Sequence, residues 1–265
     1  MFPKRLPIRQ IRQKPHKTSW EPVADWYGRY MSLGNTVQKQ VVFPNTLKLL
    51  NPKKDGRYLD IACGEGAFSR QLANVAHVVV SGVDISPSLI RQAQARAPKS
   101  AKYLVADATD FAKHFSPPFD GATCLLAIQN IEVFQTVFSE AFKVLKPGSP
   151  FILVMNHPSF RQPRQSGWGF DEGRKLQYRR VDRYLSSYDV PILAHPGSSP
   201  DVKTFSYHRP LQAYASALTA AGFVIDGLEE WVSHKVSKPG ARAKAENAAR
   251  EEIPMFLAIR AQKLV

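Results

Sequence analysis

The chain has 265 residues, of which 44% are apolar, so it is long and apolar enough for one globular domain with its own core. No run approaches the roughly 20 apolar residues of a membrane-spanning helix. The N-terminus lacks the apolar core of a signal peptide, so we expect a cytoplasmic protein. The formal net charge of +14 leaves RNA, an anionic membrane or a phosphorylated substrate open as partners. Cys63 and Cys124 are expected to be reduced core thiols, with no disulfide and no metal site.

The N-terminal region divides into a tail and a helical part. The first twenty residues hold six lysines and arginines and no acid. We therefore expect residues 1–20 to be a basic, flexible tail, with contact to RNA or a membrane as the alternative. Residues 21–265 are predicted to form a single domain. Within it, residues 21–50 are expected to form two N-terminal helices, the second kinked or split by Pro44.

From residue 57 short apolar runs alternate with helical patterns. This alternation predicts an α/β fold with a parallel sheet covered on both faces. The expected strands are 57–62, 77–84, 101–107, 119–127 and 150–156, and the expected helices are 68–76, 86–97, 109–115 and 132–148.

The alternation stops after Asn156. Residues 157–205 are rich in Arg, Tyr, Ser and Pro and show no clean period. A segment of that length without its own pattern is usually a binding insertion, so we expect a substrate lid there. A helix ending at Gly222, a strand, a charged loop and helix over 237–252 and a final strand over 253–263 complete the prediction.

The turn after the first expected strand contains Ala62, Gly64 and Gly66. Small residues let a ligand approach the backbone there, and the following helix presents its N–H groups. A glycine turn alone is weak evidence, because a nucleotide oxidoreductase would show one too, and a plain tight turn is the alternative.

Carboxylates stand at the ends of neighbouring strands, where open parallel sheets bind ligands. Asp84 ends the second strand, where it could accept both hydroxyls of a ribose or simply complement the next helix. Asp107 ends the third, where it could accept from an adenine amine or cap the helix after it. Asp60 lies just before the turn, where it could order the turn or reach an ammonium group through water.

These segments together resemble the successive motifs of the class I S-adenosylmethionine-dependent methyltransferases. The matching stretches are LDIACGEG (59–66), GVDIS (82–86), VADATD (105–110), FDGATCLLAIQNIE (119–132) and VLKPGSPFILVMNHP (144–158). The resemblance implies a Rossmann-like, doubly wound, seven-stranded sheet whose last strand is antiparallel. It implies S-adenosylmethionine as the cofactor, with the turn after the fourth strand near its methionine end. The implied cofactor-binding residues are Asp60, Ala62, Gly64, Gly66, Asp84, Ile85, Asp107, Ala108 and Ala127.

Two positions depart from known patterns. Ala62 stands where the family often has glycine, and a negative φ would accommodate it. Ser69 stands where the third glycine of a dinucleotide fingerprint would be, which argues against a dehydrogenase.

The acceptor site should be built from the segments after the fourth and fifth strands. His157 is the candidate general base, because histidine titrates near neutral pH. The alternative is that His157 hydrogen-bonds the loop before Pro158. The predicted acceptor-binding residues are Asn156, Arg161, Trp168, Tyr178 and Tyr184, since aromatics can wall a planar acceptor and arginine can hold an anion. The same residues could instead form the lid's own core.

Three functions fit the sequence. We expect a methyltransferase for a small anionic or aromatic acceptor, with motifs that resemble the ubiquinone and menaquinone enzymes. An RNA methyltransferase that uses the basic surface is the alternative, although no RNA-binding module is recognisable. A non-catalytic cofactor-binding scaffold is the third. The sequence does not predict the oligomeric state.

Overall fold

A computed structural model of the chain describes residues 20–75, 77–116, 118–193 and 203–264. The basic tail predicted for residues 1–20 therefore lies almost entirely outside the described residues. None of the helices within the described ranges is long and apolar enough to cross a membrane.

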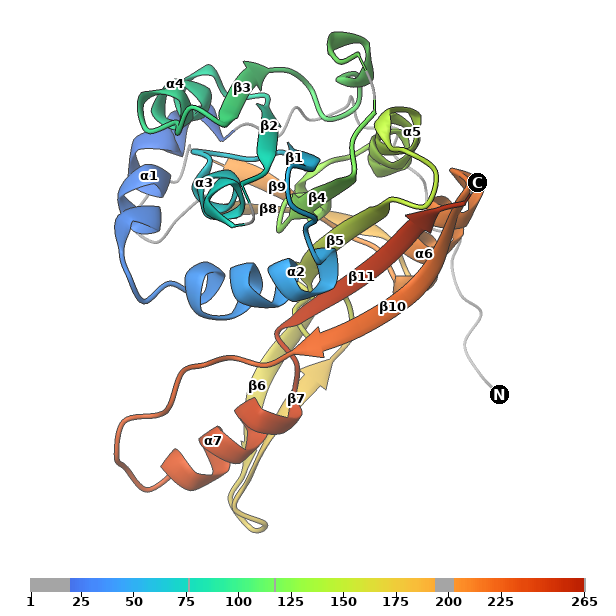
Figure 1. The fold of residues 1–265 in the computed structure, drawn as a ribbon. Helices are drawn as coiled ribbons and strands as arrows, with labels where there is room; N and C mark the ends of the chain where they lie inside the picture. Colours follow the sequence, from blue (N-terminus) through green and yellow to red (C-terminus); the bar gives the residue numbers. More distant parts are fainter. Residues whose placement is uncertain (1–19, 76, 117, 194–202, 265) are drawn as a thin grey trace.

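A seven-stranded sheet is the centre of the fold (Figure 1). Its strand order is β10-β11-β5-β4-β1-β2-β3, and β11 is antiparallel to both of its neighbours. The predicted fold class, including the antiparallel last strand, is confirmed. The strands are β1 (Arg57–Ile61), β2 (Val79–Asp84), β3 (Ala101–Val105), β4 (Gly121–Leu125), β5 (Pro150–Asn156), β10 (Phe223–Trp231) and β11 (Phe256–Lys263).

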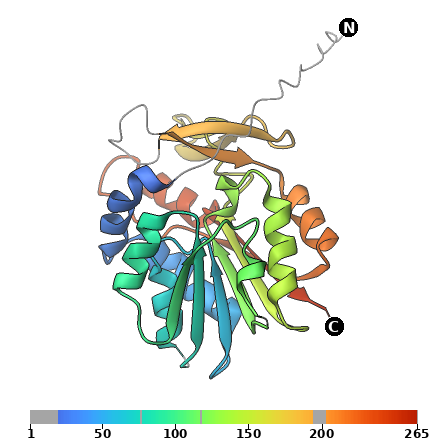
Figure 2. The same ribbon diagram turned by 90° about the horizontal axis from the view of Figure 1, so that it is seen from above.

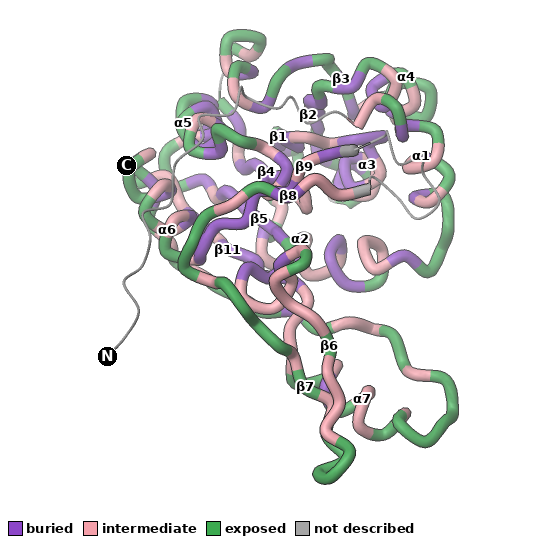
Figure 3. The backbone as a smooth tube through the Cα atoms, turned by 180° about the vertical axis from the view of Figure 1, so that it is seen from behind, coloured by how far each residue is buried: buried purple, intermediate pink, exposed green. Residues whose placement is uncertain are grey.

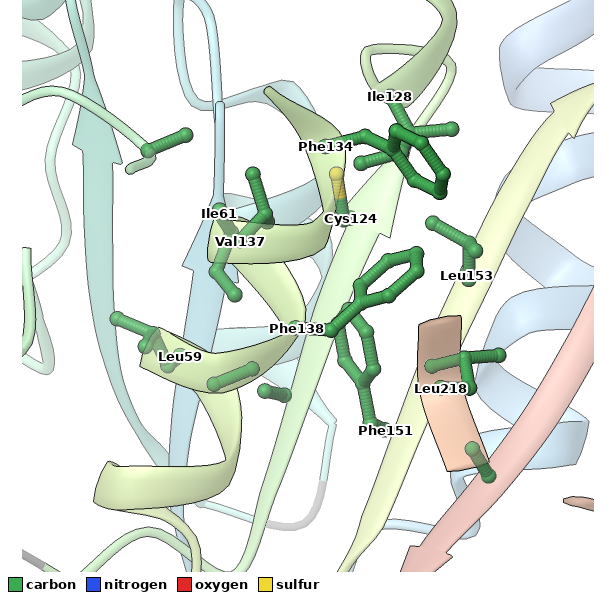
Figure 4. Packing of buried hydrophobic residues seen from close by; sticks show 14 of the residues in the cluster. Leu59, Ile61, Cys124, Ile128, Phe134, Val137, Phe138, Phe151, Leu153 and Leu218 are labelled. Atoms are coloured by element: carbon green, nitrogen blue, oxygen red, sulfur yellow. The ribbon is translucent and has the colours of Figure 1, made fainter. Parts of the chain in front are cut away.

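Helices cover both faces of the sheet, so its strands are apolar on both sides. One face carries α5 (Phe134–Val144) and α6 (Leu211–Ala220). The ring of Phe138 on α5 packs against that of Phe151 on β5 (Figure 4), with 6.0 Å between the ring centroids. Burying such a side chain fully contributes about 1.5–3 kcal/mol, so this layer anchors the strands β4 and β5 whose ends border the site.

The other face carries α2 (Phe43–Leu50), α3 (Ala67–Asn74) and α4 (Pro87–Ala95). The N-terminal segment begins with the short helix η1 (Glu21–Val23) and α1 (Ala24–Ser32). The expected effect of Pro44 appears as a change of hydrogen-bonding pattern. A π-helical stretch, η2 (Gln38–Val42), gives way to α2 at Phe43, so that Pro44 falls in the first turn, where no N–H is needed.

The segment predicted as a lid is not without secondary structure. Two hairpins begin within it, β6 (Ser166–Asp171) with β7 (Leu176–Val181), and β8 (Tyr188–Leu193) with β9 (Lys203–His208), and β9 extends three residues beyond the predicted end of the lid. The β8–β9 hairpin lies across one end of the sheet (Figure 2). There the side-chain amide of Asn130, in the turn after β4, donates to the Phe205 carbonyl at 2.8 Å.

The β6–β7 hairpin projects from the sheet together with α7 (Ala243–Glu252) (Figure 1). Arg242, which precedes α7, stacks 4.4 Å from the ring centroid of Phe170 on β6. Figure 3 shows that this projecting arm is half-buried to exposed, whereas the central strands are buried. The remaining short helices are η3 (Ala112–His114) and η4 (Ile128–Asn130).

Candidate cofactor and acceptor site

The glycine turn after β1 has a left-handed backbone. Gly64 and Gly66 have φ values of 57° and 76°, a region that favours glycine. A Cβ on Gly66 would lie 2.7 Å from the Tyr103 hydroxyl, and one on Gly64 would lie 3.3 Å from the Tyr27 ring. Both glycines therefore serve a close approach as well as a backbone conformation, which a plain tight turn would not need.

Ala62 also has a positive φ, of 57°. The expectation of a negative φ at this position is wrong. The reason is that the chain reverses sharply here, so that the N–H of Cys63 can donate to the Val83 carbonyl of β2 at 2.9 Å. A left-handed conformation costs a residue with a Cβ about 1–2 kcal/mol.

We expect Ala62→Gly to raise the free energy of unfolding by about 0.5–1 kcal/mol, because relief of this strain exceeds the entropy cost of glycine. Urea denaturation measures the change. Ala67→Gly is the matched control, since Ala67 opens α3, and there the substitution should cost up to about 1 kcal/mol. A destabilised Ala62→Gly variant would contradict the strain assignment.

Asp84 joins the end of β2 to the glycine turn. Its carboxylate accepts from the N–H of Gly64 and from that of Ser86, each at 2.9 Å, and the residue is 8% exposed. Burial raises the pKa of its carboxyl, and these two N–H donors oppose the rise. Each oxygen still has a lone pair for a further donor. Ile85 beside it is 49% exposed, an apolar surface next to a buried acid.

Asp107 follows β3 and caps the next turn. Its Oδ1 accepts from the N–H of Thr109 at 2.9 Å and from the Thr109 hydroxyl at 2.8 Å. The capping alternative is thus present in the structure, and because Asp107 is an exposed residue, its Oδ2 remains for another donor. Ala108 is buried beside it. The parallel sheet places Asp60, Asp84 and Asp107 at the ends of three successive strands β1, β2 and β3.

Asp60 is 2% exposed and held by two hydroxyl groups. Ser69 donates to its Oδ2 at 2.6 Å and Thr123 donates to its Oδ1 at 3.0 Å. Burial raises the pKa of the Asp60 carboxyl to about 6, and the two hydroxyl donors oppose that rise. Ser69 stands where a dinucleotide fingerprint would have glycine, and here its hydroxyl holds the Asp60 carboxylate in place.

The N-terminal segment forms a roof over the turn. Tyr27 of α1 shares a cleft with Asp60 and Ala62. Glu21 accepts hydrogen bonds from the Ser86 and Ser88 hydroxyls at the start of α4, and from the Ser88 N–H at 3.1 Å. This contact fixes the helices of residues 21–32 to the rim of the site. No local signal in the sequence indicated it.

The turn after β4 holds an unsatisfied acceptor. Ala127 is half-buried there, next to Leu126, which has a φ of 55°. The Gln129 amide donates to the Leu126 carbonyl at 2.6 Å. Its Oε1 is buried with no hydrogen-bond partner among the described residues. A buried acceptor of this kind costs about 1–3 kcal/mol unless a ligand donates to it.

His157 follows β5 and is tied on both ring nitrogens. Its Nδ1 accepts from the Ser159 N–H at 3.2 Å, so its Nε2 carries the proton and donates to Glu230 at 2.6 Å. Burial lowers the pKa of His157, and Glu230 opposes that effect. Glu230 lies on β10, on the far side of β5 from β4. A role as general base stays a prediction, and it requires one of these hydrogen bonds to break.

Two of the predicted acceptor residues come together. Arg161 and Trp168 are in contact, with the Arg161 guanidinium carbon 5.3 Å from the ring centroid. Asn156 is exposed at the end of β5.

The other two predicted acceptor residues pack within the insertion. Tyr178 covers Gly169 on the opposite strand of its hairpin, where an added Cβ would lie 2.4 Å from the ring. The Tyr184 hydroxyl accepts from the Leu211 N–H at 2.9 Å, at the start of α6.

Comparison with known proteins identifies the fold. Residues 59–153 match the model of the Methyltransferase domain family. A solved S-adenosylmethionine-dependent methyltransferase from Mesorhizobium loti superposes with a TM-score of 0.64 at 26% identity, covering 86% of this chain and 98% of that one. The domain match and the shared fold together support a class I S-adenosylmethionine-dependent methyltransferase.

Curated relatives of this methyltransferase match over its central part. A demethylmenaquinone methyltransferase from Leptospira interrogans is 31% identical over 100 residues, which are 36% of this chain and 40% of that protein. A ubiquinone biosynthesis O-methyltransferase from Thiobacillus denitrificans is 28% identical over 100 residues, 37% of this chain and 43% of that protein. The chain thus spans about two fifths of the length of these relatives.

The methyltransferase site fits its family's cofactor chemically. S-Adenosylmethionine presents ribose hydroxyls, an adenine amine and an ammonium group, all of them donors. The site presents acceptors that suit these donors: the carboxylates of Asp84 and Asp107 and the unsatisfied Oε1 of Gln129. The turn after β1 lies beside these acceptors, and its residues Ala62, Gly64 and Gly66 keep it free of bulky side chains. Among the described residues no group of three or more His, Cys, Asp or Glu could hold a metal ion.

Proposed function

We propose that this chain transfers the methyl group of S-adenosylmethionine to a small acceptor that is anionic or aromatic, on oxygen, nitrogen or carbon. The observation that carries the proposal is the Arg161–Trp168 pair beyond the end of β5. It sets a cation and an aromatic ring side by side in the segment that follows β5. An aromatic wall suits a planar acceptor and a guanidinium suits an anionic one.

The chain's own residues would align the two reactants. The cofactor supplies a methyl group on a sulfonium, which is already a good leaving group. Asp84, Asp107 and the glycine turn would hold it from β1, β2 and β3, while the acceptor would lie beyond β4 and β5. Alignment of this kind accounts for much of the rate enhancement available to a bimolecular step. We also propose that residues 21–265 act as one domain, with residues 157–205 as the acceptor lid.

The relatives support a small acceptor. The names of the Leptospira and Thiobacillus proteins refer to demethylmenaquinone and to ubiquinone biosynthesis, and quinones are planar ring compounds. A planar ring could stack on Trp168, which is 39% exposed.

Calorimetric titration with S-adenosylmethionine, and separately with NAD, tests the proposal. We expect micromolar binding of the first and none of the second, followed by transfer of a labelled methyl group to a member of a panel of phenols and aromatic acids. Cofactor binding without turnover on any acceptor would favour a scaffold. Turnover on RNA alone would favour the RNA methyltransferase.

His157→Ala tests the general base. If His157 removes the acceptor proton, turnover should fall while the affinity for S-adenosylmethionine stays the same. Unaltered turnover would leave His157 as the residue that fixes the loop after β5 through Ser159 and Glu230.

A further inference from the structure

A second pocket, of about 360 Å³, lies beside the projecting arm. It is bounded by the loop after β10, by α7 and by the start of the β6–β7 hairpin, the region at the bottom of Figure 1. A pocket of this size is within the range of small-molecule sites. The residues that matter for its chemistry are Arg161, Trp168, Lys235, Lys238 and Arg250.

The pocket has an excess of positive charge. Arg250 is compensated, because it lies 3.7 Å from the carboxylate of Glu246, the only acid among the lining residues. Arg161, Lys235 and Lys238 form no ion pair with any described residue. Three cations therefore face one cavity without a counter-charge, and an anion entering it would meet all three.

Of these three cations, Arg161 is expected to reduce the stability of the fold most. Its Nε is buried and has no acceptor among the described residues. Its guanidinium carbon and that of Arg179 lie 5.3 and 5.1 Å from the centroid of the same Trp168 ring, so two like charges contact one aromatic side chain. Burial, together with the charge of Arg179, lowers the pKa of Arg161 to about 10. A half-buried cation without a counter-charge is destabilising, and such exceptions concentrate at functional sites.

Arg179 differs from Arg161 because its guanidinium has hydrogen-bond acceptors within the protein. The Arg179 Nε donates to the Phe160 carbonyl at 2.6 Å, and its Nη2 donates to the Ser166 hydroxyl at 2.8 Å. Arg179 thus supports one side of Trp168, while the donors of Arg161 remain available to a ligand in the pocket.

We propose that this pocket binds a phosphate group carried by the methyl acceptor, at the end remote from the methylated atom. The inference rests on the proposed function and narrows its acceptor class. A phosphate fits better than a carboxylate because a single carboxylate would be satisfied by the fork of Arg161 alone. A dianionic phosphate ester instead matches a guanidinium with two further ammonium groups.

The position of the pocket defines the shape of the acceptor. The loop that carries Lys235 follows β10, and β10 lies three strand positions from β4 in the sheet order. At about 4.8 Å per strand the two ends are roughly 14 Å apart. The methyl group should be delivered near the turn after β4, so the acceptor is an elongated molecule with its phosphate on the β10 side and its reactive atom on the β4 side.

Binding of phenyl phosphate to the full chain tests the site, with benzoate and inorganic phosphate as comparison probes. We expect phenyl phosphate to bind more tightly than benzoate. Arg161→Gln and the double variant Lys235→Gln/Lys238→Gln should each weaken binding at least tenfold. The double variant Lys48→Gln/Lys102→Gln is the matched control. It removes the same charge from two exposed positions that do not line the pocket, one on α2 and one on β3, the strand at the opposite edge of the sheet, and should change affinity less than twofold.

The outcomes separate this site from the general charge of the protein. Equal weakening in the control variant, or no binding of phenyl phosphate at millimolar concentration, would overturn the phosphate site. A short single-stranded RNA that displaces phenyl phosphate at equal phosphate concentration, and that loses affinity in the same variants, would overturn the small-molecule assignment in favour of RNA. Melting curves check folding. Arg161→Gln should melt close to wild type, because it loses the contact with Trp168 but no hydrogen-bond acceptor, and it also removes a charge that has no counter-charge.

S-Adenosylmethionine binding, measured on the same samples, distinguishes the two proposals. Cofactor binding that is present in wild type and unchanged in the pocket variants, together with loss of phenyl phosphate binding, is the expected result. Cofactor binding without phenyl phosphate binding would overturn the phosphate site alone. Phenyl phosphate binding without cofactor binding would overturn the proposed function, and with it the assignment of the phosphate to a methyl acceptor.

Discussion

Replacing Asp84 with alanine should weaken the binding of S-adenosylmethionine by roughly a hundredfold to ten-thousandfold. The carboxylate is placed to accept both ribose hydroxyls, and each charge-assisted hydrogen bond contributes about 1.5–3 kcal/mol. It also holds the N–H groups of Gly64 and Ser86, so its removal loosens the turn that the cofactor would contact. Calorimetric titration measures the affinity, at a temperature at which the melting curve shows the variant folded.

Two further variants make this result specific. Asp84→Asn keeps the shape of the side chain and one acceptor oxygen, so its affinity should fall between those of wild type and Asp84→Ala. Asp110→Asn removes an exposed carboxylate near the same sheet edge and should leave the affinity unchanged. If Asp84→Ala lowered only the melting temperature, Asp84 would be a residue that closes the turn and would have no part in cofactor binding.

The arrangement of the acids could be predicted because it depends on strand ends. A parallel sheet brings the carboxyl ends of its strands to one edge, so the apolar runs before Asp60, Asp84 and Asp107 were enough to place them together. The glycine turn was predictable for the same reason. The φ of Ala62 was not, because it depends on the hydrogen bond that Cys63 forms with Val83 on a different strand.

The strands of the insertion could not be predicted from periodicity. A strand shows an alternating pattern when one face is buried and the other is wet. β6 and β7 are half-buried or exposed along their whole length, so neither face selects apolar residues. The long-range polar contacts were hidden for another reason. Glu21 and Ser86 are 65 residues apart and His157 and Glu230 are 73 apart, and no local rule connects them.

Replacing Asp60 with asparagine should make the protein more stable at neutral pH and a weaker binder of its cofactor. Burial raises the pKa of this carboxyl from 3.8 to about 6. Between these values the folded chain keeps a proton that the unfolded chain releases. Stability therefore falls as the pH rises from about 4 to about 6 and stays lower above it. The difference of about two pKa units corresponds to about 3 kcal/mol.

Asparagine removes this cost and keeps both hydrogen bonds. Its carbonyl oxygen can accept from one of the hydroxyls of Ser69 and Thr123, and its NH₂ group can donate to the other. Urea denaturation at pH 4, 6 and 7.5 should show a gain of up to about 3 kcal/mol at pH 7.5 and a flatter pH profile. Asp120→Asn is the control of opposite sign. Although burial raises the pKa of Asp120, hydrogen bonds from Lys146 and the Arg57 N–H lower it overall, so that variant should lose stability at pH 7.5.

The same Asp60→Asn variant also tests whether the buried carboxylate of Asp60 has a role in cofactor binding. If the carboxylate faces the ammonium group of the cofactor, directly or through water, its loss should reduce the affinity for S-adenosylmethionine even as stability rises. A protein that gains stability and keeps full affinity would show that Asp60 only orders the turn. A loss of stability at pH 7.5 would contradict the raised pKa itself, since a carboxyl that costs nothing when ionised leaves asparagine nothing to relieve.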